Sequence, residues 1–186
     1  MTPKFTKDWF DDAIPNWEKH VKPLVSTVPN AKWLEIGSFE GRSALWTLEN
    51  LLLGKESTIT CVDPWPDIAS PPYTADYSST FDANLAPHRH RLIKLRGNSR
   101  DILHALPPDT FHGAYIDGSH EEMDVLDDAH GTWPLLRKSA ILIFDDYTRR
   151  GRAYPGVKKA VTLFLRDPNM HFKRLHEGQQ IILQKT

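Results

Sequence analysis

Cysteine is almost absent from this sequence. Cys61 is the one cysteine among 186 residues, so a disulfide within the chain is excluded. It lies in an apolar run, residues 59–62, where a buried structural thiol is expected rather than a nucleophile. The first eight residues also lack the apolar segment of a signal peptide. These absences predict a reducing, cytoplasmic setting.

Long apolar runs and an excess of one charge are missing too. No run approaches the ~20 apolar residues that a membrane-spanning helix needs. The 23 basic and 24 acidic residues give a net charge of -1, so the chain has no basic surface typical of nucleic-acid or membrane binding. Linkers and internal repeats are absent as well, which predicts a single domain over residues 1–186.

Residues 33–44 read as a buried strand, a glycine turn and the start of a helix. Leu34 and Ile36 supply the apolar strand, and Gly37 and Gly41 mark the turn. Apolar residues then recur at helical spacing from residue 44 to residue 52. Because open α/β sheets place their sites at the carboxyl ends of strands, we expect a ligand at this turn.

Strands and helices alternate along the rest of the chain. Strands are predicted at residues 58–63, 91–97, 111–117 and 140–144, with helices near 79–85, from 98, from 124 and over 157–165. Residues 172–176 and 180–184 are too close for a helical crossover, so they predict an antiparallel hairpin. The expected fold is α/β: a Rossmann-like, doubly wound sheet of seven strands, mostly parallel with an antiparallel C-terminal strand, in three layers.

Three further segments are expected around the cofactor and substrate. Residues 1–30 predict an N-terminal helical cap, which begins near Pro15 and is kinked or ended by Pro23. The proline-rich segment 64–90 and the loop 147–156 are predicted to lie on the substrate side. Basic residues at 149–152 are interpreted as a solvated loop, although such a loop could also recruit an anionic substrate group.

The glycine turn does not have the spacing of a dinucleotide site, because the G-x-G-x-x-G pattern is missing. Glu35, just before the turn, would repel a pyrophosphate and favour a cationic amine. Asp63, at the end of the next strand, is placed to accept hydrogen bonds from two ribose hydroxyls. An adenosine with an amino-acid tail and no phosphate satisfies both residues, and S-adenosylmethionine is such a ligand.

Five motifs carry a family resemblance, at residues 35–43, 62–65, 97–99, 116–120 and 144–147. With them, residues 30–186 resemble a class I S-adenosylmethionine-dependent methyltransferase, and within that class the metal-dependent O-methyltransferases of the catechol and macrocin types (methyltransferase family 24). Trp65 is expected to flank the adenine. The resemblance implies that the cofactor is bound by Glu35, Gly37, Ser38, Gly41, Ser43, Asp63, Trp65, Asn98, Ser99 and Asp117.

Three aspartates follow two strands that should be neighbours. Asp117, Asp145 and Asp146 would converge, and such carboxylates repel one another unless they are protonated or neutralised by a cation. Oxygen ligands suit Mg²⁺. In the enzymes that the chain resembles, the positions matching these three aspartates bind the metal, and the residue three after the first aspartate, here His120, is a candidate base. In metal-free relatives Asp117 contacts the methionine amine or caps a helix, and His120 would then be a surface residue.

The acidic residues at 121, 122, 124, 127 and 128 are interpreted as a solvated helix face rather than as ligands. The predicted function is transfer of a methyl group to a hydroxyl oxygen of a small molecule or sugar, with a divalent metal chelating vicinal oxygens and with His120 and Asp117 as catalytic residues. Alternatives are a metal-independent N- or carboxyl-methyltransferase, an NAD(P)-dependent oxidoreductase and a non-catalytic binding subunit. Few extra segments cover the acceptor, which leaves room for a homo-oligomer.

Overall fold

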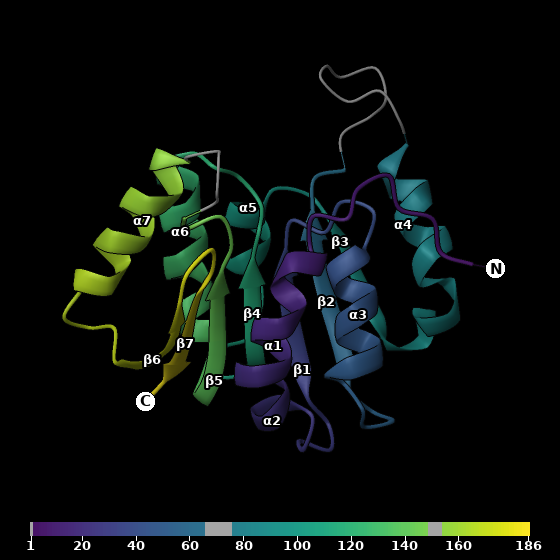
Figure 1. Ribbon diagram of the computed structural model, residues 1–186, viewed down its shortest axis with the longest axis horizontal. Helices are drawn as coiled ribbons and strands as arrows, with labels where there is room; N and C mark the ends of the chain where they lie inside the picture. The colour runs from purple at the N-terminus through teal and green to yellow at the C-terminus, as the bar shows by residue number, and fades with distance from the viewer. Residues whose placement is uncertain (1, 66–75, 149–153) are drawn as a thin grey trace.

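A sheet of seven strands forms the middle layer of the part of the chain that the computed structural model describes, residues 2–65, 76–148 and 154–186 (Figure 1). Its order is β3-β2-β1-β4-β5-β7-β6. The strands are β1 (Lys32–Ile36), β2 (Thr58–Asp63), β3 (Leu92–Arg96), β4 (Phe111–Ile116), β5 (Leu136–Phe144), β6 (Phe172–Glu177) and β7 (Ile181–Lys185). The seven predicted strands are confirmed.

The pairing of the strands also agrees with the sequence prediction. β1 pairs in parallel with β2 and β4, and β2–β3 and β4–β5 are parallel too. β7 runs antiparallel to both β5 and β6. The strand order reverses between β1 and β4, and this switch point is where an open α/β sheet forms its binding crevice.

Helices cover both faces of the sheet, because side chains alternate across each buried strand. Strand residues such as Trp33 and Tyr115 face one apolar core, whereas Leu34 and Ile116 face the other. Helices α1 (Ile14–His20), α2 (Lys22–Val25), α3 (Arg42–Asn50) and α4 (Tyr77–Leu85) lie on the first side, and α5 (Ser99–Leu103), α6 (Glu122–Thr132) and α7 (Pro155–Arg166) on the second. The three-layer prediction is therefore confirmed.

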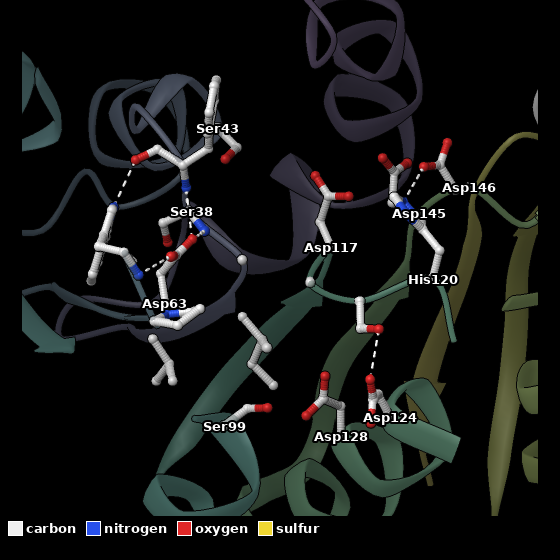
Figure 2. A pocket seen from close by; sticks show the side chains of 18 of the residues that line it. Ser38, Ser43, Asp63, Ser99, Asp117, His120, Asp124, Asp128, Asp145 and Asp146 are labelled. Atoms are coloured by element: carbon white, nitrogen blue, oxygen red, sulfur yellow. Dashed lines mark hydrogen bonds and ion pairs between the residues drawn. The ribbon is translucent and has the colours of Figure 1, made fainter. Parts of the chain in front are cut away.

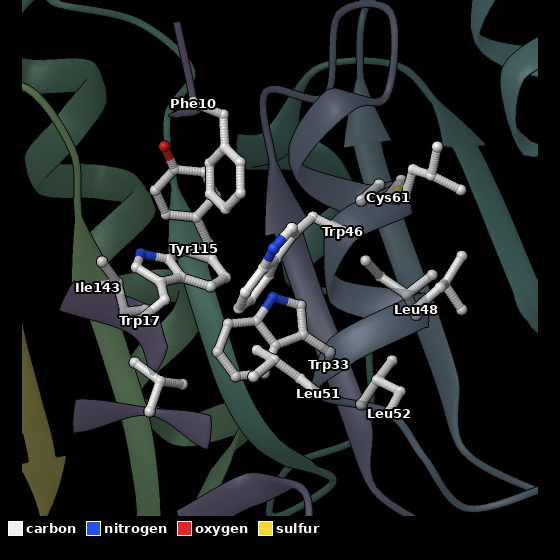
Figure 3. Packing of buried hydrophobic residues seen from close by; sticks show 14 of the residues in the cluster. Phe10, Trp17, Trp33, Trp46, Leu48, Leu51, Leu52, Cys61, Tyr115 and Ile143 are labelled. Carbon is white, nitrogen blue, oxygen red and sulfur yellow. The ribbon is translucent and has the colours of Figure 1, made fainter. Parts of the chain in front are cut away.

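Aromatic side chains hold the N-terminal segment against the sheet (Figure 3). Trp17 of α1 is fully buried, and its ring meets Tyr115 edge-on at 4.9 Å and Phe10 at 5.0 Å. Trp33 and Trp46 lie beside it, with ring centroids 5.6 and 5.9 Å away. Edge-to-face packing of this kind adds to the free energy gained from burial. The position of the N-terminal segment over the strand ends is thereby fixed.

The predicted boundaries shift in several places. In the N-terminal cap, helix occupies η1 (Asp11–Ala13), α1 and α2, whereas residues 2–10 are not helical. The helix breaks at Val21, and Pro23 lies in the first turn of α2, where its missing N–H costs little. Parts of the two predicted substrate-side loops, residues 66–75 and 149–153, lie outside the described residues. In the first loop, predicted over 64–90, the described part from residue 76 onwards contains α4 and η2 (Ala86–Arg91).

Candidate active site

A cavity of about 690 Å³ opens at the carboxyl ends of β1 to β5 (Figure 2). Its size falls within the usual range of small-molecule sites. Most of the predicted site residues line it: Gly37, Ser38, Ser43, Asp63, Trp65, Asn98, Ser99, Asp117, His120, Asp145 and Asp146. Glu35 and Gly41 do not. The topology has therefore brought residues from five strand ends to one wall.

Two glycines shape the turn after β1, and both have φ of +82°. A Cβ atom on Gly37 would lie 2.1 Å from the backbone oxygen of Asp117, so only glycine lets these two loops meet. A Cβ atom on Gly41 would lie 2.5 Å from Leu85 of α4. Gly41 thus packs the start of α3 against α4, which is a structural role outside the cavity wall.

Asp63 organises the donor side of the cavity, as the dashed lines in Figure 2 show. Its Oδ2 accepts hydrogen bonds from the backbone N–H groups of Ser38 and Phe39 at 2.9 and 3.0 Å. Its Oδ1 accepts one from the N–H of Trp65 at 2.7 Å. An ionised carboxylate has about four lone-pair sites, so one remains for a ribose hydroxyl. The sequence indicated only the ribose contact and not the support of the loop.

Trp65 forms a fixed wall beside Asp63. The side chain is 1% exposed, and its Nε1 donates a hydrogen bond to the backbone oxygen of Phe39 at 2.8 Å. The ring packs 4.8 Å from that of Phe81, and the Lys94 ammonium lies 4.6 Å from the indole centroid. These contacts hold the indole against α4 and the loop after β1, and contact with an adenine stays a prediction.

Glu35 is completely buried behind Ser38 and Ser43. Burial raises the pKa of its carboxyl from 4.5 to about 7, although the two serine hydroxyls beside it lower the pKa in part. Neither carboxyl oxygen makes a hydrogen bond of good geometry with a described residue. Glu35 is therefore a latent negative charge, close to the cavity wall, that a cationic group would draw into its ionised form.

Three carboxyl groups gather at the other end of the cavity. Burial, together with the negative charges of Asp145 and Asp146, raises the pKa of Asp117 well above its ordinary value. Tyr115 donates a hydrogen bond to Asp117 Oδ2 at 3.0 Å. Burial and the charge of Asp146 also raise the pKa of Asp145, whose Oδ1 accepts a hydrogen bond from Gln180 at 2.8 Å. This end of the cavity has an excess of negative charge.

His120 belongs to the same cluster. Its Nε2 lies 2.9 Å from Asp146 Oδ2, and its ring stacks on Tyr154 at 3.9 Å with an interplanar angle of 14°. One ligand atom each from Asp117, His120 and Asp146 lie within 4.8 Å of one another, as a metal site requires. Sequence reasoning named Asp145 rather than His120 as the third ligand. Both Asp145 and His120 line the cavity, so their positions alone do not decide which of them would be the third metal ligand.

Two groups of cavity residues were missed from the sequence. Trp9 and Phe10 come from the non-helical N-terminal segment. In this segment Thr6 donates two hydrogen bonds to the Glu40 carboxylate, one from its backbone N–H at 2.7 Å and one from its hydroxyl at 3.0 Å. Asp124, Asp127 and Asp128 were interpreted as part of a solvated helix face, but all three line the cavity, and Asp128 is 3% exposed. Its i, i+4 spacing from Asp124 was the available signal.

Among the described residues, no helix is both long enough and apolar enough to cross a membrane. Residues 34–147, more than half of the chain, match the methyltransferase domain family. The chain belongs to this family. It is an S-adenosylmethionine-dependent methyltransferase. The alternatives of an oxidoreductase and of a non-catalytic binding subunit lose their support, because the matched segment contains both the glycine turn and the acidic cluster.

Solved structures share the fold of this methyltransferase. A Corynebacterium glutamicum protein is 18% identical, covering 98% of this chain and 92% of its own, with a TM-score of 0.66. A putative caffeoyl-CoA O-methyltransferase from Staphylococcus aureus is 14% identical (98% and 85% covered, TM-score 0.68). The O-methyltransferase TomG from Streptomyces achromogenes, solved with S-adenosylmethionine, is 16% identical (92% and 80%, 0.66). No curated protein matches the sequence. At such identities the likeness concerns the fold.

Proposed function

We propose that this methyltransferase transfers the methyl group of S-adenosylmethionine to a hydroxyl oxygen of a small molecule or sugar, with a divalent cation, Mg²⁺ by its donor preference, chelating vicinal acceptor oxygens. One observation carries the proposal: Asp117, Asp145, Asp146 and His120 gather in the same cavity as Gly37 and Asp63. TomG and the Staphylococcus aureus protein are described as O-methyltransferases, the latter as a putative one, which supports an oxygen acceptor.

The acidic cluster fits a hard divalent cation. Carboxylate oxygens are the ligands that Mg²⁺ prefers. Burial, and after it the charges of the neighbouring aspartates, raise the pKa of Asp117 and of Asp145, and a bound cation would offset both effects. We propose Asp117, Asp145 and Asp146 as ligands. When bound, the cation would supply Lewis acidity that lowers the pKa of an acceptor hydroxyl.

His120 is proposed as the base that removes the hydroxyl proton. The 2.9 Å contact with Asp146 fixes one ring nitrogen as the hydrogen-bond donor, so Nδ1 becomes the nitrogen that accepts the proton. Stacking on Tyr154 fixes the plane of the imidazole. Both contacts orient a residue whose side chain is 41% exposed and can therefore meet a substrate.

The donor half of the cavity orients the methyl group. The methyl donor carries an activated sulfonium, so the protein mainly has to align two reactants. We propose that Asp63 holds the ribose, that Trp65, Asn98 and Ser99 border the adenine, and that Ser38 and Ser43 face the amino-acid tail. Trp9 and Phe10 line the cavity from the N-terminal segment. Closure of the cavity by a second copy of the chain stays a prediction.

The experiment that tests metal dependence uses the whole chain with a chelator and a set of acceptors that offer vicinal hydroxyls, amines or carboxylates. We expect turnover only with hydroxyl acceptors, its loss in chelator and its recovery with Mg²⁺. Thermal unfolding gives a second measurement: Mg²⁺ should raise the unfolding temperature of the wild type and of Asp82→Asn, but not of Asp117→Asn. Full activity in chelator would contradict the metal part of the proposal.

A second candidate is a metal-independent methyltransferase acting on nitrogen or carboxylate acceptors. The hydrogen-bonded pair of His120 and Asp146 favours it, because such a pair can move a proton without a metal. Asp145→Asn separates the two candidates, since the hydrogen-bond partner of His120 Nε2 is Asp146 and not Asp145. A metal-dependent enzyme should lose catalysis and keep its affinity for S-adenosylhomocysteine, whereas a metal-independent one should keep both.

A further inference from the structure

Asp128 of α6 is a buried carboxyl group that the proposed reaction does not use. It is 3% exposed, it lines the cavity, and Figure 2 shows its carboxyl group turned towards the space between Ser99 and Asp117. The Ser99 hydroxyl lies near enough to lower the pKa of this carboxyl in part. Burying a carboxyl group is costly unless it is hydrogen-bonded, so this position favours a ligand that donates hydrogen bonds.

The surroundings of Asp128 place that ligand. A Cβ atom on Gly118 would lie in ordinary van der Waals contact, 3.7 Å from Asp128 Oδ2 and 3.4 Å from Ile36 Cγ2, so the backbone of Gly118 runs directly beside the Asp128 carboxyl group. Asn98, whose side chain caps α5 by accepting a hydrogen bond from the Arg100 N–H, brings Ser99 to the same place. Asp63, the proposed ribose ligand, lines the same cavity from the end of β2. A base attached to that ribose can extend between Ser99 and Gly118 to reach Asp128.

An adenine presents one strong donor on its edge, the exocyclic amino group, and an ionised carboxylate offers only acceptors. We propose that Asp128, positioned by Ser99, accepts a hydrogen bond from the exocyclic amino group of the methyl donor and selects adenine over bases that carry an oxygen there. This inference rests on the proposed placement of the adenosine. It replaces the interpretation of Asp128 as a solvated residue.

The charge state of Asp128 sets the conditions of the test. Burial raises the pKa of its carboxyl to about 6; the hydroxyl of Ser99 lowers the pKa, the charge of Asp124 raises it and that of Arg100 lowers it. At pH 8 the carboxyl group is therefore ionised, and every measurement below is made at that pH.

The experiment compares S-adenosylhomocysteine with S-inosylhomocysteine, in which a keto oxygen replaces the amino group. Isothermal titration calorimetry on the wild type should show a preference for the adenosyl compound of about 10-fold or more, as expected for a hydrogen bond to a charged group. Asp128→Ala should weaken the adenosyl compound and bring the two Kd values close together. Asp128→Asn should also lose the preference, but by gaining affinity for the inosyl compound, because an amide can donate to the keto oxygen.

The ratio of the two Kd values separates recognition from a structural role. If Asp128 only supports α6 or Ser99, its substitution weakens both ligands equally and the ratio stays at the wild-type value, which would overturn the inference. Asp101→Ala is the matched control: it removes an exposed carboxyl of α5 that is not among the cavity residues, and it should keep the ratio. A wild type that binds both ligands equally would refute the Asp128 inference alone. A wild type that binds neither would contradict the proposed function as well.

Discussion

The two ends of the cavity differ in how their charges are compensated. At the donor end, the Asp63 carboxylate accepts three backbone hydrogen bonds. At the acidic end, Asp117 and Asp145 receive one side-chain hydrogen bond each, and they face each other and Asp146. The donor end is thus built by the fold itself. The acidic end is left with electrostatic repulsion, which a bound cation would relieve.

The largest effect on catalysis is expected from a substitution at the acidic end of the cavity. Asp146→Asn should lower kcat by roughly 100-fold or more, because it removes the negative charge of a residue that is both a proposed metal ligand and the partner of His120. The Kd for S-adenosylhomocysteine should stay close to that of the wild type, since the donor end is intact. Initial rates and calorimetry measure the two quantities. Asp82→Asn on α4 is the control. If Asp146→Asn weakened the binding of S-adenosylhomocysteine as much as it lowers kcat, the two ends of the cavity would not be independent.

A substitution at the donor end should instead weaken cofactor binding. Asp63→Ala removes the acceptor that holds the N–H groups of Ser38, Phe39 and Trp65, together with the proposed ribose contact, so the Kd for S-adenosylhomocysteine should rise about 100-fold. Stabilisation by Mg²⁺ in thermal unfolding should persist, because the acidic end is unchanged. Asp63→Asn should have a smaller effect, because the amide keeps one acceptor oxygen. Loss of the Mg²⁺ effect in either variant would argue against separate ends.

Glu35 is the acidic residue of the donor end whose carboxyl oxygens make no hydrogen bond of good geometry with a described residue. Its pKa is raised in the folded state, so its contribution to stability is fully present below pH 4.5 and is lost as the pH rises to about 7. Glu35→Gln cannot ionise. The free energy of unfolding of this variant relative to the wild type should therefore increase by about 3 kcal/mol between pH 4.5 and pH 8. Urea unfolding over this pH range measures it, and a difference independent of pH would contradict the assignment.

The smallest effect is expected at the support of the acidic end. Trp17 Nε1 donates a hydrogen bond to Gln180 Oε1 at 2.8 Å, and Gln180 Nε2 donates to Asp145. Gln180→Met should cost about 1–2 kcal/mol of stability and raise the pKa of Asp145 further, because it removes a buried hydrogen-bond pair. Thermal unfolding measures the loss, with Gln184→Met on the same strand as control. Because a proton then competes better with the cation for Asp145, Mg²⁺ should stabilise Gln180→Met less than the control.

Much of the fold could be predicted from particular residues. The alternation of Leu34 and Ile36 with their neighbours, and the apolar run that ends β5, identified strands because burial on both faces demands such patterns. The start of β5 at Leu136 was missed, since residues 137–139 are exposed and carry no apolar signal. Asp128 was misread for a related reason: its burial depends on how α5 and the loop after β4 pack against α6, which the sequence pattern does not show.

The sequence by itself determined the strand ends that carry the site, since Asp63, Asp117 and Asp145–Asp146 each follow an apolar strand and parallel strands end at one edge. Only the tertiary structure decided how those groups interact. In the folded protein, Asp63 accepts hydrogen bonds from the backbone of the glycine turn, and His120 pairs with Asp146. Folding also places Asp128, Trp9 and Phe10 in the wall of the cavity. Periodicity records which face of an element is buried, whereas hydrogen-bond partners and pKa values depend on distances between segments that only folding brings together.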